Sequence, residues 1–215
     1  MAITTSKLQI PTILTWSTRL GWVATAVALS QAIDGLNAGL TVTISTWLLW
    51  VAGAVAVFVG SPLTLTLART TLPLSIPAAV LVLIAGANVT LGTIGLIASL
   101  VASYSVFTAE VGQRWVQFAA YGAERRFPLR PPLGFALPAV VLWVLVAVLA
   151  SYAVVSAEGS QAALAVALGA IAAALGGLGS SRWHRLSCRW LVLVPAGVVI
   201  HDPLVLMETA MWRSH

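Results

Sequence analysis

Three uncharged apolar runs restrict what this chain can fold into more than any other feature of its sequence. They are Leu40–Gly60, Leu133–Val155 and Gln161–Ser180. A helix needs about 20 apolar residues to cross about 30 Å of hydrocarbon, and each run is close to that length. The chain is 60% hydrophobic and only 8% charged, whereas soluble domains carry about 25% charged residues. The sequence therefore predicts an all-α integral membrane protein.

Three further segments are also predicted to be spans. Arg19–Leu36 is shorter than the others, and Leu72–Asn88 runs directly into Val89–Phe107. Because this continuous region is too long for one helix, we expect two short helices that turn near Gly86–Asn88, with one helix plus a re-entrant segment as the alternative. The prediction is thus six transmembrane helices, in a four-helix membrane region over 19–107 (spans at about 19–36, 40–60, 72–88 and 89–107) and a two-helix hairpin over 133–180.

The basic residues predict the orientation of these spans. All eleven fall within segments 1–18, 61–71, 108–132 and 181–215 or at the adjoining ends of spans, while the opposite turns carry only Asp34 and Glu158. Lys and Arg are concentrated in cytoplasmic loops, so both termini are predicted to be cytoplasmic. The preference for Arg over Lys and the abundance of Ala, Val, Leu and Gly indicate a GC-rich genome, and hence a bacterial plasma membrane.

The start of the chain has an alternative interpretation. Lys7 and Arg19 precede the apolar stretch 20–29, and the small residues Ser30 and Ala32 follow on either side of Gln31. This order resembles a signal peptide with its cleavage site. Cleavage there would leave the orientation of the following span unchanged.

The stretch "YGAERRFPLRPP", at 121–132, gathers an unusual share of the charge. One interpretation is a loop that fixes the orientation of the span after it, since Arg in a short loop controls topology. The other is a docking surface for a partner protein or for anionic lipid headgroups. The residues predicted to form that surface, together with the arginines that follow the last span, are Glu124, Arg125, Arg126, Arg130, Arg182, Arg185 and Arg189.

The last predicted span carries small residues at steps of four. They are Ala165, Gly169, Ala173 and Gly177, beside a bulkier stripe that includes Leu168. Small residues at this spacing let two helix backbones approach closely in lipid, and we predict a helix-packing face. The alternative is that an Ala-rich segment produces such spacings by chance.

No motif in the sequence predicts catalysis. No span holds an ionisable residue near its centre, which argues against an ion-coupled transporter. His184 and Cys188 lack a second close pair of ligands and lie among arginines, so no metal site is predicted. Phosphate-binding loops and nucleophile elbows are also absent from the sequence. Because the basic residues follow the membrane pattern rather than a nucleic-acid footprint, we expect no nucleic-acid partner, no cofactor and no enzyme.

The segment 181–215 differs from the rest of the chain. "RWLVLVPAGVVIHDP" predicts two strands around a turn at Pro195–Gly197, which gives a short β-prone cytoplasmic tail. A lone hairpin is only marginally stable in water. We therefore expect either the start of a longer domain or a hairpin that packs against the membrane or a partner.

"YGAERRFPLRPP" and "HRLSCRWLVLVPAGVVIHDPLVL" together resemble an uncharacterised actinobacterial family of multi-pass membrane proteins, most clearly over residues 121–206. The resemblance implies that the chain is a shortened member or a fragment, and it implies no activity. The predicted function is a non-catalytic membrane component that assembles with partners in the lipid bilayer. The alternative is a transporter or permease for a neutral or lipidic substrate, with a polar cavity near Thr90, Thr93 and Ser99.

Overall fold

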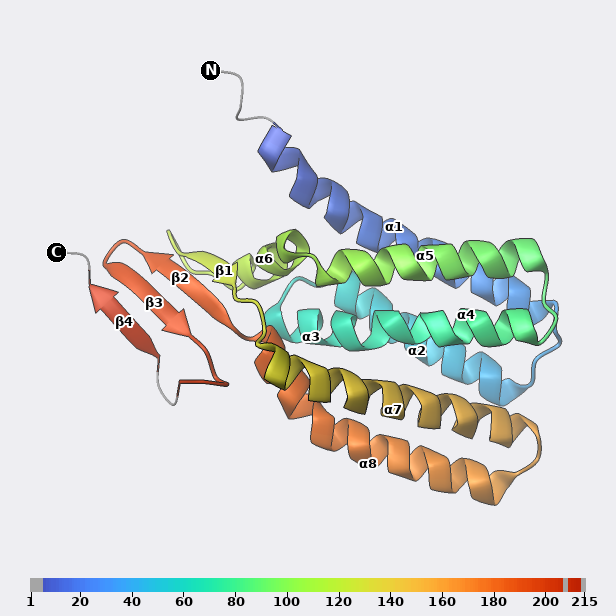
Figure 1. Cartoon of the computed structure of the whole chain (residues 1–215). Coiled ribbons are helices and arrows are strands. Elements are labelled where there is room, and N and C mark those ends of the chain that lie inside the picture. The colour runs from blue at the N-terminus through green and yellow to red at the C-terminus, as the bar shows by residue number, and fades with distance from the viewer. Residues whose placement is uncertain (1–5, 207–208, 214–215) are drawn as a thin grey trace.

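The structure is a computed structural model that describes residues 6–206 and 209–213, with side chains from residue 11 onward. Long helices run side by side, and a small antiparallel sheet lies at one end of them (Figure 1). The helices are α1 (Ser6–Asp34), α2 (Leu40–Phe58), α3 (Pro62–Thr71), the 3-10 turn η1 (Leu72–Leu74), α4 (Ser75–Ile84), α5 (Val89–Phe107), α6 (Ala109–Gln117), α7 (Leu133–Glu158) and α8 (Ala162–Ser187). The strands are β1 (Arg125–Pro128), β2 (Trp190–Val194), β3 (Gly197–His201) and β4 (Ala210–Arg213).

Five helices in the described part of the chain are long and apolar enough to cross a membrane, where six spans were predicted. They are α2, the continuous unit from α3 to α4, α5, α7 and α8. The predicted turn between the two middle spans is present at residues 85–88, where Gly86 has a φ of 86°. The segment 108–132, predicted to be a loop, contains α6 and β1 instead.

The helix α1 begins at Ser6 rather than near Arg19, and it is not among these five. Its mean hydropathy is lowered by polar side chains, and three of the threonines lie on its inner face. Thr15, Thr18 and Thr25 are buried, and each donates a hydrogen bond to the carbonyl four residues earlier. A hydropathy average counts these residues as polar, although their hydroxyl groups are satisfied inside the helix.

The segment 61–71, predicted to be a connection between spans, is largely the helix α3. Its start is a capping box in which the Ser61 hydroxyl accepts a hydrogen bond from the Thr64 N–H and the Thr64 hydroxyl accepts one from the Ser61 N–H. Pro62 follows at the first helical position, where its missing N–H costs little. Pro73 lies in the 3-10 turn that joins α3 to α4. This candidate span therefore begins at Pro62 rather than at the predicted Leu72.

Small residues allow α1 and α5 to pack along most of their length. A Cβ atom on Gly21 would lie 3.2 Å from the Ala98 carbonyl oxygen, and one on Gly95 would lie 2.6 Å from the Leu29 side chain. Such close backbone approach is the usual way in which helices gain van der Waals contact in lipid. The α1–α5 pair is therefore closely packed.

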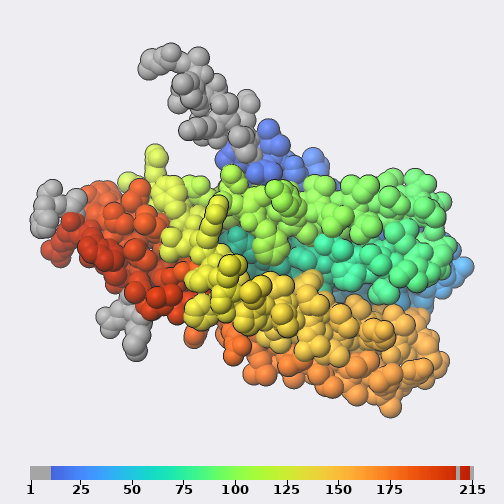
Figure 2. Space-filling model, viewed as in Figure 1, coloured from blue at the N-terminus to red at the C-terminus, as the bar shows by residue number. Residues whose placement is uncertain are grey.

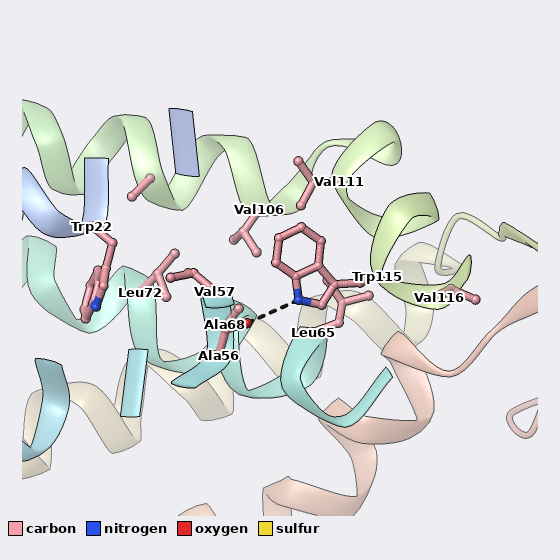
Figure 3. Packing of buried hydrophobic residues seen from close by; sticks show 11 residues of the cluster. Trp22, Ala56, Val57, Leu65, Ala68, Leu72, Val106, Val111, Trp115 and Val116 are labelled. Carbon is pink, nitrogen blue, oxygen red and sulfur yellow. Dashed lines mark hydrogen bonds between the residues drawn. The ribbon is translucent and has the colours of Figure 1, made fainter. Parts of the chain in front are cut away.

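Two buried tryptophans, Trp22 and Trp115, belong to one hydrophobic cluster (Figure 3). Trp22 from α1 packs against Gly53 of α2, where a Cβ atom would come within 2.1 Å of the indole ring. Trp115 from α6 packs among residues of α2, α3 and α5, and its indole N–H donates to the Ala56 carbonyl oxygen at 3.2 Å. Because Trp115 is only 1% exposed, α6 is a fixed part of the fold that closes one end of the helical body.

The predicted hairpin is present, and it forms the middle of a four-stranded sheet with the order β1-β2-β3-β4. Arg126 of β1 lies opposite Val192 of β2, so the stretch "YGAERRFPLRPP" contributes an edge strand. Gly197 begins β3 with a φ of 149°, and a Cβ atom there would clash with the Trp212 backbone. We refer below to the sheet end, where these strands lie, and to the loop end, where the turns 35–39, 85–88 and 159–161 lie (Figure 1). A space-filling view shows the sheet continuing directly from the helices (Figure 2).

Candidate functional site

The residues predicted to form a docking surface divide into two groups in the structure. Arg125, Arg130, Arg182 and Arg185 are exposed at the sheet end. Glu124, Arg126 and Arg189 instead make ion pairs within the protein. Only the first group is available to an external partner without breaking an internal contact.

Arg189 is a correction to the predicted set, because it is only 6% exposed and forms a bidentate ion pair with Asp202. Its Nε donates to Asp202 Oδ1 at 2.8 Å and its Nη2 donates to Oδ2 at 2.5 Å. Its Nη1 donates to the Arg130 carbonyl oxygen at 2.8 Å. These bonds hold the pKa of Asp202 below its usual value. Arg189 therefore joins the end of β3 to residues 129–132, which connect β1 to α7.

Glu124 and Arg126 pair with each other at the start of β1. Arg126 Nη2 donates to Glu124 Oε2 at 3.0 Å, and this bond, followed by one from the Tyr121 N–H, lowers the pKa of Glu124. Gln117, at the end of α6, accepts from the Arg126 N–H and donates to the Glu124 carbonyl oxygen. The loop is thus ordered by its own polar groups.

Arg126 also lies over the ring of Trp190, 5.7 Å from its centroid, and Trp190 stacks on His201. Burial, followed by the positive charge of Arg126, lowers the pKa of His201, while Asp202 acts in the opposite direction. The pair Glu124 and Arg126 contributes to the sheet rather than to an open charged surface.

A pocket of about 550 Å³ lies at the sheet end, where α3, the α5–α6 junction, the β1–α7 connection and the adjacent ends of α7 and α8 meet. Its apolar lining includes Pro73, Phe107, Val140, Trp143 and Trp183. Its charged lining consists of Arg69, Arg130 and Arg189. From the sequence, Arg69 indicated only the orientation of the neighbouring spans. Nothing near it in the sequence indicates that α5 and α7 converge on it.

His184 and Cys188 do come together, as their spacing of four on a helix requires. Cys188 Sγ lies 3.3 Å from His184 Nε2, and His184 Nδ1 lies 3.1 Å from the Thr66 hydroxyl. Burial raises the pKa of the Cys188 thiol to about 11, so it is a poor nucleophile at neutral pH. Within residues 6–206 and 209–213, no group of three or more His, Cys, Asp or Glu residues is placed to hold a metal ion.

The predicted small-residue stripe on α8 is split between two faces. Ala165 and Gly169 are partly buried against α7, with a Gly169 Cβ atom 3.9 Å from Ala153. Ala173 and Gly177 are exposed, and a Cβ atom on Gly177 would meet nothing within 4 Å. The α7-facing side instead continues through Ala172, Gly176 and Gly179. A strict step of four drifts around a helix of 3.6 residues per turn, which is why the stripe leaves the contact.

The residues on which the transporter alternative depends do not share a surface. Ser99 is buried between α1 and α5, with its hydroxyl 3.4 Å from that of Thr25. Thr90 and Thr93 are exposed near the loop end. These three side chains therefore do not line a common polar cavity.

Comparison with protein families, with curated proteins and with solved structures finds no match to this chain. The resemblance noted over residues 121–206 therefore remains a prediction from the sequence.

Proposed function

We propose that this protein is a multi-pass membrane protein that crosses the bilayer six times and acts as a non-catalytic assembly component. Membrane insertion is supported by the outer surface of the helices. Along α2, large apolar side chains are exposed at steps of three and four, at Leu40, Ile44, Leu48, Val51 and Val55. A soluble protein rarely leaves so long an apolar face in water.

The sixth span in this proposal is α1. Its outward side chains include the apolar Ile13, Leu20, Val23 and Val27, while the hydroxyl of the buried Thr25 lies 3.4 Å from that of Ser99 in α5. Arg19 reaches the Val57 carbonyl oxygen at the sheet end of α2 and lies over the rings of Trp16 and Phe58. With α1 as a span, the two ends of the chain lie on one side, and the sheet end is cytoplasmic by its excess of arginine.

The observation that carries the assembly proposal is the isolation of the α7–α8 hairpin. In the most apolar 18-residue segment of each of these helices, only 11% of the residues are buried. The corresponding share in α5 is 44%. The two helices pack mainly on each other (Figure 1). One link to the rest is Glu158, whose carboxylate accepts a hydrogen bond from the Val42 N–H at the start of α2.

The outer face of α8 has the shape that suits a second helix. Its exposed residues include a small-residue face at alternating steps of four and three, which consists of Ala163, Ala167, Ala170, Ala174 and Gly177. Lipid tails solvate such a face as well as any other, but a neighbouring helix gains van der Waals contact by close approach. We therefore propose that a helix of a second copy of the chain packs on this face.

A disulfide test in membranes addresses this proposal directly. Ala170→Cys, in a Cys188→Ser background, should form a crosslinked species on mild oxidation, and adding Ala174→Leu should weaken it because the bulky side chain separates the backbones. Val101→Leu, on the exposed face of α5, is the control and should leave crosslinking unchanged. A chain that stays uncrosslinked and monomeric in mild detergent would contradict the assembly role.

A further inference from the structure

The pocket at the sheet end is not used by the assembly role, and it lies where the helices meet the predicted cytoplasmic surface. The segment that leads from β1 into α7 (yellow in Figure 2) lies beside α5 and α6 at this junction. Phe107 and Val140, which line the pocket, are themselves exposed on α5 and α7. In a bilayer, the pocket would thus border both the hydrocarbon and the headgroup region.

The pocket presents two arginines without an acidic partner. Within the part of the chain that the structure describes, the ion pairs are Arg126–Glu124 and Arg189–Asp202, so neither Arg69 nor Arg130 belongs to one. The lining includes no Asp or Glu. An unpaired guanidinium at the edge of the hydrocarbon is costly, and an anion in the pocket would reduce that cost.

Contacts with α5 and α6 hold the Arg69 guanidinium in the pocket. Its Nε donates to the Val106 carbonyl oxygen at 3.4 Å, and its guanidinium lies 5.8 Å from the centroid of Phe107. A Cβ atom on Gly112 would lie only 3.0 Å from Arg69 Nη2, so the glycine leaves room for this arrangement. A guanidinium has five N–H donors, and one carbonyl leaves most of them available.

The remaining lining is apolar. The indole N–H of Trp143 donates to the Thr70 carbonyl oxygen and that of Trp183 donates to the Ala139 carbonyl oxygen, each at 3.0 Å. Both indole N–H groups therefore have hydrogen-bond acceptors, and the rings present apolar carbon surfaces to the pocket. The volume falls in the range of about 300–1,000 Å³ that is usual for ligand sites.

We propose that this pocket binds an anionic lipid, with the phosphate of its headgroup on Arg69 and Arg130 and the start of its acyl chains along Trp143 and Val140. A free phosphate would use the arginines but would leave the apolar lining uncovered, whereas a lipid matches both parts. The proposal requires membrane insertion but does not depend on the assembly role.

The test uses the full chain in a neutral detergent and native mass spectrometry with two lipids that share acyl chains, dioleoyl phosphatidylglycerol and dioleoyl phosphatidylcholine. We expect preferential binding of phosphatidylglycerol. Arg130→Gln and Arg69→Gln should each lower its occupancy about five- to tenfold, as expected for one basic group that contacts an anionic headgroup. Arg125→Gln is the matched control, since Arg125 is exposed and lies outside the pocket lining, and it should have little effect.

A second variant separates the loss of charge from a loss of folding. Ala136→Trp keeps every arginine but fills the apolar part of the pocket, and it should also abolish the preference while the lipid-free protein keeps its melting temperature. Equal binding of the two lipids, or equal effects of Arg125→Gln and Arg130→Gln, would overturn the proposal. Inorganic phosphate that displaces the lipid at equal concentration would overturn it too, in favour of a small-anion site.

Discussion

At the scale of single residues, the contact that most affects the sheet end is the buried pair Arg189 and Asp202. Burying two charges is costly, and the cost is offset only when both ions keep good hydrogen bonds. Here Asp202 accepts two bonds from Arg189 and one from the Leu204 N–H. The pair thus has a structural role. Its removal should lower the free energy of unfolding rather than weaken binding.

We predict that Asp202→Asn lowers the free energy of unfolding by about 3–5 kcal/mol at pH 7, because it leaves the Arg189 charge buried without its partner. Since the folded pKa of Asp202 is lowered, its contribution is complete above the unfolded value of about 3.9 and is lost as pH falls through the folded value. The melting temperatures of the two proteins should therefore differ from pH 7 down to about pH 4 and begin to converge below it. Asp34→Asn, exposed at the loop end, is the control. Curves that stay parallel in acid would contradict this role.

A second residue-scale prediction concerns Cys188. Its buried thiol has a pKa raised to about 11, so the reactive thiolate is scarce at pH 8. Maleimide labelling followed by mass spectrometry should be slow for the folded protein and fast after denaturation. Labelling of the folded protein at the rate of a free cysteine would show that the thiol is accessible.

At the scale of elements, the hairpin α7–α8 offers a matched pair of glycines. Gly169→Leu should insert a side chain against Ala153 and cost about 1–3 kcal/mol by overpacking. Gly177→Leu should leave the stability of the single chain nearly unchanged, because nothing lies within 4 Å of its Cβ position. Thermal unfolding in a detergent that keeps the protein monomeric compares the two. Equal losses would mean that the α7–α8 contact differs from the one described.

Elements defined by local patterns were predictable from the sequence, and elements that depend on distant contacts were not. The apolar runs gave α2, α5, α7 and α8, because length and hydropathy alone identify a span. The Pro195–Gly197 turn predicted the β2–β3 hairpin for a similar local reason. In contrast, β1 forms because Arg125–Pro128 pairs with Trp190–Val194, and nothing local marks such a long-range partner.

The candidate site shows the same division. The exposed arginines 125, 130, 182 and 185 were predictable from charge, but burial of Arg189 follows from its partner Asp202, thirteen residues away. Arg69 was missed as a pocket residue because its neighbours come from α5, α6 and the β1–α7 connection. The start of α3 was missed for another reason, since its capping box has Thr64 where the usual sequence signature has Glu or Gln.

At the scale of the whole molecule, the small antiparallel sheet lies at one end of the helical body, and the short turns lie at the other (Figure 1). Among the described residues, the arginines lie toward the sheet end, while Asp34 and Glu158 lie at the loop end. An excess of arginine at one end is typical of the cytoplasmic side of a membrane protein. We therefore expect the two ends of the molecule to face opposite sides of a membrane.

Impermeant thiol labelling of intact cells tests that claim most directly. Ala123→Cys reports on the sheet end and Gln161→Cys on the loop end, each in a Cys188→Ser background, and both positions are exposed. Gln161 is preferred to Glu158, whose carboxylate caps α2. Because the sheet end is expected to be cytoplasmic, Gln161→Cys should be labelled on intact cells. Ala123→Cys should be labelled only after the membrane is permeabilised. Labelling of Ala123→Cys but not Gln161→Cys on intact cells would contradict it.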